Sequence, residues 1–263
     1  MKTEIRVLEK PKLDNPLFIE GLPGIGNVGR VAAGYLIDEI KAKKFAELYS
    51  RHFLPFVLVH ENAEIYLLKN EFYYYKAKSK KERDLVILVG DSQSLDPVGH
   101  YEIVWKVLEF ASELGCKEIV TLGGFGTGNL DESNPKVIGA VSHEEIKKKY
   151  EKHGIDFNVA GKLGTIVGAS GLLLGLGKFK EMKGVCVMAE TAGFPIVTDP
   201  KAAEAVLKVV ASILGMDMDM SKLDKRVEEM EQFIKKIETM QRKAVEEISQ
   251  KKEGKDEQTR YIG

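Results

Sequence analysis

Short apolar or β-branched runs alternate with helical patterns from residue 4 to about residue 215, and this alternation limits the possible folds more than any other feature. Two helix starts are marked by Asp96-Pro97 and Asp199-Pro200, in which a capping carboxylate precedes a proline. Gly115 and Gly215 stand where the same two helices are expected to end. The alternation predicts an α/β protein whose sheet is mixed but largely parallel and carries helices on both faces.

The positions of the expected elements follow from the same patterns. Residues 56–76 are expected to form meandering antiparallel strands, whereas the other strands alternate with helices. Helices are predicted at residues 27–40, 97–114, 143–150, 164–175 and 201–214. Strands are predicted at residues 4–8, 17–20, 45–49, 56–60, 63–68, 72–76, 85–89, 118–122, 136–140 and 184–188.

Composition narrows the range of partners. Lys and Arg number 39 against 40 Asp and Glu, and this balance gives no reason to expect a nucleic-acid partner. The first residues lack the apolar core of a signal peptide, and the longest weakly polar stretch, residues 163–176, is shorter than a membrane span of about 20 residues. Cys116 and Cys186 lie far apart in apolar surroundings. We therefore expect buried free thiols, no membrane segment and a cytoplasmic protein.

Beyond Gly215 the composition changes, and a long helix is expected to begin at Ser221. Its apolar or small residues are spaced 4-3-4-3-4-3-4, a heptad seam interrupted only by Gln241. Further apolar residues widen the stripe, which favours self-association of more than two copies over packing of one helix onto its own domain. The chain is accordingly divided into an α/β domain (1–215), an oligomerisation helix (216–249) and a disordered polar tail (250–263). The expected seam residues are Leu223, Val227, Met230, Ile234, Ile237, Gln241, Ala244 and Ile248.

The polar tail ends in Arg260-Tyr261-Ile262-Gly263, so that two apolar residues follow a solvated tether. This ending is either a plug that docks into a pocket on a partner or a terminus without function. Composition alone favours neither interpretation.

Gly24, Gly26 and Gly29 form a G-x-G-x-x-G pattern between an expected strand and an expected helix, which is the context of a dinucleotide site. Three features count against that interpretation. Another expected strand, residues 4–8, precedes this one. Pro23 lies inside the turn, and Glu47 falls within its strand instead of at the end of it. We interpret the glycines as a tight turn that allows close packing, and we predict no cofactor.

A second glycine cluster, Gly123-Gly124-Phe125-Gly126-Thr127-Gly128, follows the strand expected at 118–122, at the edge where α/β sheets bind ligands. It is not a phosphate loop, and Ser170 is outside any nucleophile elbow, so Ser170 is interpreted as a small residue in a helix contact. The histidines and cysteines lack metal-ligand spacing, and no metal site is predicted. Glu190 and Asp91 remain as acid or base candidates for a small-molecule enzyme, the alternative hypothesis.

Four blocks in order, residues 21–29, 123–128, 168–175 and 190–195 followed by 199–203, resemble the archaeal branch of the proteasome-assembly-chaperone family. The resemblance covers about residues 5 to 215. It implies a three-layer α/β/α sandwich of nucleoside-phosphorylase-like architecture without that enzyme's activity, so we expect a protein that is not an enzyme. The alternative becomes a relative of nucleoside hydrolases or phosphorylases with a site near residues 123–128 and Glu190.

The same resemblance implies a role for the C-terminal segments. Archaeal relatives carry a helical extension for homo-oligomerisation followed by flexible tails, and activators end in hydrophobic–Tyr–any residue, which inserts between α-subunits of the proteasome core particle. Here Tyr261 is third from the end, and Ile262 stands where that motif has its tyrosine. The resemblance thus implies a homo-oligomer that binds the core particle, its α-subunits or a paralogue without ATP, with Tyr261, Ile262 and Gly263 as contacts.

Overall fold

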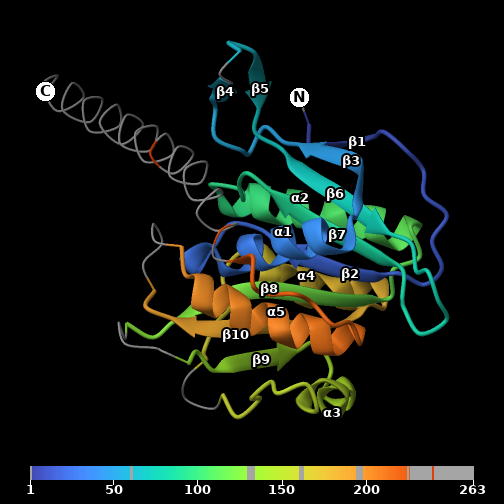
Figure 1. Ribbon diagram of the computed structural model, residues 1–263. Coiled ribbons are helices and arrows are strands. Elements are labelled where there is room, and N and C mark those ends of the chain that lie inside the picture. Colours follow the sequence, from blue (N-terminus) through green and yellow to red (C-terminus); the bar gives the residue numbers. More distant parts are fainter. Residues whose placement is uncertain are drawn as a thin grey trace, which may run out of the picture.

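The computed structural model describes residues 2–59, 62–128, 134–159, 163–193 and 198–223, together with Lys225 and Thr239. An eight-stranded mixed sheet forms the centre of the molecule (Figure 1). Its four neighbouring strands β7, β2, β8 and β10 run parallel, and antiparallel strands flank them on both sides. The strands in spatial order are β1 (Glu4–Val7), β3 (Lys43–Tyr49), β6 (Asn70–Tyr75), β7 (Leu85–Gly90), β2 (Leu17–Gly21), β8 (Glu118–Gly126), β10 (Lys183–Thr191) and β9 (Val137–Val141).

Helices cover both faces of this sheet (Figure 1). On one face α1 (Val28–Ile40) packs against α5 (Pro200–Leu214), and the short α3 (Lys147–Glu151) adds its buried Tyr150. On the other face α2 (Pro97–Glu113) packs against α4 (Ala169–Gly177). Each face has its own cluster of buried apolar side chains, which explains why the parallel strands read as almost continuous apolar runs. The predicted mixed α/β class is confirmed; the likeness to nucleoside phosphorylases stays a prediction.

The predicted helix starts are confirmed by their caps. Asp96 accepts a hydrogen bond from the amide of Gly99 at 2.8 Å, and Asp199 accepts one from the amide of Ala202 at 2.9 Å. Both carboxylates satisfy an amide that the first turn leaves without a partner in the helix. Gly215 ends α5 with a φ of 64°, in the left-handed region that favours glycine. The described residues also form three single 3₁₀ turns: η1 (Ile25–Asn27), η2 (Glu144–Ile146) and η3 (Lys178–Lys180).

Several predicted elements need correction. The strand expected at 184–188 runs from Lys183 to Thr191, and the helix expected at 143–150 is divided into a 3₁₀ turn and the short α3. The helix expected at 164–175 begins only at Ala169, because Gly168 has a φ of 89° and a non-helical ψ. The strand expected at 118–122 continues to Gly126, since β10 keeps pairing with it as far as Thr191. The segment 56–76 is not one meander. It splits into a separate hairpin of β4 (Val57–Val59) and β5 (Ile65–Leu67), while β6 joins the main sheet.

Only a small part of the predicted C-terminal assembly lies within the described residues. Leu223 is buried, at 2% exposure, and belongs to the apolar cluster of α1 and α5. Cys116 and Cys186 are buried free thiols, as predicted. Among the described helices, none is long and apolar enough to cross a membrane. The following residues lie outside the described part of the chain: Val227, Met230, Ile234, Ile237, Gln241, Ala244, Ile248, Tyr261, Ile262 and Gly263, with the rest of the tail 250–263.

The turn after β2 brings α1 unusually close to the sheet. A β-carbon on Gly21 would collide with the carbonyl oxygen of Gly29, and one on Gly29 would collide with the carbonyl oxygen of Leu122. Gly26 adopts a φ of 62°, which bends the chain into the helix. These glycines therefore serve a tight turn and close helix–sheet packing, as the sequence analysis favoured.

We expect Gly29→Ala to lower the free energy of unfolding by about 1–3 kcal/mol, because the added methyl group must push α1 away from β8. Gly175→Ala is the matched control. Gly175 lies on the exposed side of α4 with no atom within 4 Å of an added β-carbon, so the same change there should raise stability by up to about 1 kcal/mol. Chemical denaturation of both variants measures this. Equal effects at the two positions would contradict the packing argument.

Candidate functional site

Polar side chains interrupt an apolar row that crosses the middle of the sheet. Glu20 on β2 pairs with Thr121 on β8, and Thr121 pairs in turn with Cys186 on β10. Because side chains alternate between the two faces of a sheet, these three lie on one face, the face that α2 and α4 cover. On the other side of Glu20 the row continues with Leu88 of β7. A glutamate inside such a row is rare, because burying a carboxyl group is costly.

Glu20 is fully buried and held by two donors. One carboxyl oxygen accepts a hydrogen bond from the amide of Leu22, and the other accepts one from the hydroxyl of Ser170, each at 2.9 Å. No described basic side chain forms an ion pair with Glu20. Burial raises the pKa of this carboxyl to about 7, and the two hydrogen bonds oppose that shift only in part. With a pKa of about 7, Glu20 titrates near neutral pH, and the Ser170 hydroxyl is in direct contact with its carboxyl group.

A cavity of about 740 Å³ opens above this pair, at the carboxyl ends of the parallel strands. Ser170 and Cys186 line its floor, and residues 123–126 with Gly128 form part of its wall. Gln93 joins two sides of it, because its amide nitrogen donates to the carbonyl oxygen of Pro23 at 2.6 Å and its oxygen accepts from the amide of Ala169 at 2.9 Å. The volume lies in the range of small-molecule sites.

The cavity falls at a reversal point of the sheet. After β2 the chain enters α1 on one face, and after β7, the strand next to β2, it enters α2 on the other face. The two connections diverge and leave a crevice between them, which is where open α/β sheets bind ligands. Leu22 after β2 and Ser94 after β7 both line the cavity.

The structure separates the residues of the enzyme hypothesis. The glycine cluster 123–128 borders the cavity, but neither Glu190 nor Asp91 is among the residues that line it. Asp91 instead faces Arg30, with a carboxylate oxygen 3.6 Å from a guanidinium nitrogen. Sequence reasoning missed Glu20, although a glutamate at an inward position of the apolar strand 17–21 was an available signal. It treated Ser170 as a packing residue, whereas its hydroxyl binds Glu20.

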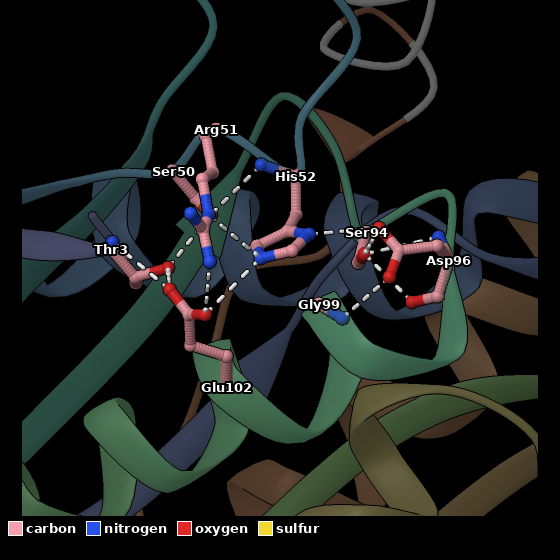
Figure 2. A network of polar contacts seen from close by, with 8 residues as sticks. All are labelled: Thr3, Ser50, Arg51, His52, Ser94, Asp96, Gly99 and Glu102. Atoms are coloured by element: carbon pink, nitrogen blue, oxygen red, sulfur yellow. Dashed lines mark hydrogen bonds and ion pairs between the residues drawn. The ribbon is translucent and has the colours of Figure 1, made fainter. Parts of the chain in front are cut away.

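A second polar network lies where α2 begins (Figure 2). His52 bonds through Nδ1 to Asp96 at 2.9 Å and through Nε2 to Glu102 at 3.2 Å, and Glu102 also accepts from the amide and hydroxyl of Thr3. The two carboxylates raise the pKa of His52, and the largest cause is the hydrogen bond that the imidazole donates to Asp96. Ser94 contacts Asp96 and not the imidazole, so no nucleophile–base pair forms here. The network ties the start of the chain and the loop after β3 to the first turns of α2.

The fold and the site together define a mixed α/β domain with a ligand-sized cavity and, among the described residues, no cluster of three metal-ligating side chains. The chain belongs to the PAC2 family, whose model matches residues 18–238.

Similar proteins come from archaea. The crystal structure of Pyrococcus furiosus PbaB, an archaeal proteasome activator, is 44% identical with a TM-score of 0.81, and the match covers 90% of this chain and 99% of that one. Pyrococcus furiosus PbaA, an archaeal homologue of proteasome-assembly chaperone, is 27% identical with a TM-score of 0.73 over 91% and 98% of the two chains. An uncharacterised protein of Methanocaldococcus jannaschii is 39% identical over 98% of this chain and 96% of its own length.

Glu20 should make stability depend on pH. Its pKa is about 7 in the folded protein against 4.5 for a glutamate exposed to solvent, so the folded state keeps a proton that the unfolded state releases between these values. The contribution of this group to stability therefore falls as pH rises through that window, by up to about 3 kcal/mol. We expect Glu20→Gln, which cannot ionise, to lose this part of the pH dependence.

Denaturation at about pH 5 and about pH 8 measures the difference, with Glu144→Gln on an exposed turn as the control. The control should follow the unmodified protein at both values. An identical pH dependence of Glu20→Gln and the unmodified protein would show that Glu20 is ionised in the fold, against this prediction.

Proposed function

We propose that this protein is a homo-oligomeric, ATP-independent partner of the proteasome that acts through its C-terminal tails. The observation that carries the proposal is the 44% identity to PbaB over 90% of this chain. The sequence identity to PbaA is lower, at 27%. We therefore favour an activator of the core particle. The two other possibilities are a chaperone for the α-subunits and a protein that assembles with a paralogue. We further propose that the α/β domain is a nucleoside-phosphorylase-like sandwich that serves as a scaffold. It is proposed to have no enzymatic activity.

The oligomer is proposed to form through the seam 223–248. Leu223, its first residue, is buried in the apolar cluster to which α1 and α5 contribute, so the proposed seam would begin next to the domain. The proposed bundle would place several tails on one assembly. Weak contacts of single tails then add up, because the second contact forms within one complex.

The β4–β5 hairpin offers a further surface for assembly. Its outer side consists of two cross-strand aliphatic pairs, Val57 with Leu67 and Val59 with Ile65, whose exposures run from 38% to 63%. Opposite them, Leu58 is buried against the body of the domain. Exposed aliphatic residues gathered on one side of an element are typical of a protein interface. We place a neighbouring subunit of the oligomer on this hairpin.

The position of the tyrosine provides a sharp test of the tail. Deleting Gly263 alone makes Tyr261 second from the end, where the activator motif has its tyrosine. We expect this deletion to raise affinity for the cognate latent core particle by about tenfold, because ring and carboxylate then have the spacing of that motif. Deleting Tyr261, Ile262 and Gly263 together should abolish binding.

Peptide hydrolysis by the core particle, titrated with each form, measures both effects. Gln258→Ala, in the polar tether, serves as the control and should stimulate like the unmodified protein. Undiminished stimulation after removal of the last three residues would refute docking through the tail. If the unmodified protein does not stimulate hydrolysis but binds free α-subunits, its function is in proteasome assembly and not in activation.

The seam predicts a clear effect of one buried charge. Ile234→Lys places an ammonium group in the proposed apolar interface, so the oligomer should dissociate into smaller species. Lys235→Ser, one position further and outside the seam, should leave the assembly intact. Light scattering after size-exclusion chromatography gives the mass of each variant. An unchanged mass for Ile234→Lys would favour the alternative, a helix packed on its own domain.

A further inference from the structure

Two glycines face the cavity although the fold does not require glycine there. Gly123 lies within β8, and an added β-carbon would meet only the side chain of Met188, at an ordinary 3.7 Å. Gly24 has an extended backbone with a φ of −167°, and no atom lies within 4 Å of its added β-carbon. Gly124, by contrast, is required, because a β-carbon there would collide with the carbonyl oxygen of Ile25. Both glycines line the cavity, so a larger side chain at Gly123 would narrow it, and one at Gly24 would narrow its exposed border.

The described part of the lining carries no formal charge. None of the described residues that border the cavity is Asp, Glu, Lys or Arg. His100 is the one histidine among them, and burial lowers its pKa, which keeps the imidazole neutral at physiological pH. A charged ligand would enter this space without a counter-charge and lose its hydration. The chemistry of the described lining therefore favours an uncharged molecule over a charged one.

The apolar part of the lining suits a flat ring. Met188 lies on the floor, and Phe125 and Ile166 belong to the walls. A methionine sulfur and an aromatic side chain both make favourable contacts with aromatic rings. At about 740 Å³ the cavity has room for one ring system with a substituent.

Ser170 supplies a polar contact whose direction can change. While Glu20 is ionised, the Ser170 hydroxyl donates to it, at 2.9 Å, and only the lone pairs of Ser170 remain for a ligand. When Glu20 holds a proton, it can donate to Ser170, and the hydroxyl then points its own hydrogen elsewhere. A carboxamide group, with a donor nitrogen beside an acceptor oxygen, satisfies both arrangements.

We propose that the cavity binds a small uncharged aromatic molecule that carries a carboxamide-type edge, with Ser170 contacting that edge and Gly123 and Gly24 leaving room for the ring. The described lining contains no residue of the proposed seam or tail, so the proposed ligand does not depend on which partner the tail binds. Glu20 acts as a positioning residue, because it touches Ser170 and does not line the cavity.

Benzamide and benzoate are the probes. They share a ring and nearly a shape, and they differ in charge. Titration of the full-length protein, followed by saturation-transfer NMR, should show benzamide binding with a dissociation constant of about millimolar, as expected for a ligand of this size. Benzoate should bind at least about tenfold more weakly. No saturable benzamide binding, or equal affinity of the two probes, would overturn the proposal.

Cavity-filling variants locate the binding. Gly123→Leu should weaken benzamide binding by at least about tenfold, and Gly24→Leu, in an exposed turn, serves the same purpose if the first variant fails to fold. Ser170→Ala should weaken benzamide more than benzene, because only benzamide loses a hydrogen bond. Gly175→Ala, on the far side of α4, should change neither. Benzamide affinity that survives every folded cavity variant would place the binding elsewhere and overturn the assignment.

Discussion

The close approach of α1 to the parallel strands is the contact on which the other features depend. Gly21 and Gly29 permit it, and the turn between them then runs directly over the ends of β2 and β8. The carbonyl oxygen of Gly26 in that turn accepts a hydrogen bond from the amide of Asp199, the cap of α5, at 2.9 Å. Asp199 also accepts from Thr191 at the end of β10. One tight turn thus positions two helices and one wall of the cavity.

Glu20 shows that the domain does not maximise its own stability. A leucine in its place would continue the apolar row that Leu88 begins, and burial of a lone carboxyl group is instead unfavourable by several kcal/mol unless it keeps a proton. The cavity has the same character, because apolar walls left without packing partners lose contacts that a filled core would make. Residues that lower stability in this way concentrate at binding sites, where preformed polar geometry is needed.

Local signals made most of the fold predictable, and long-range pairs account for what was missed. Asp96-Pro97 and Asp199-Pro200 predicted the starts of two helices, because a helix cap is formed by residues that are close together in the sequence. The extension of β8 to Gly126 depends on pairing with β10, which no local pattern reveals. The site was harder still, since Ser170 and Glu20 are 150 residues apart. The glycines of 123–128 were correctly predicted to lie at the ligand-binding edge of the sheet. They directly follow a strand in the sequence, and the sequence alone therefore places them at the carboxyl end of that strand.

The cavity and residues 219–223 are joined by a physical path. Tyr35 of α1 donates a hydrogen bond to the carbonyl oxygen of Asp219, and Leu223 packs into the cluster that α1 and α5 share. The turn at the start of α1 lines the cavity, so the same helix touches the proposed ligand at one end and the root of the seam further along. A ligand changes assembly only if it binds differently to two positions of this helix. The small β-carbon clearances around Gly21 and Gly29 leave α1 little freedom, so a ligand would chiefly stabilise the domain and keep the root of the seam in place.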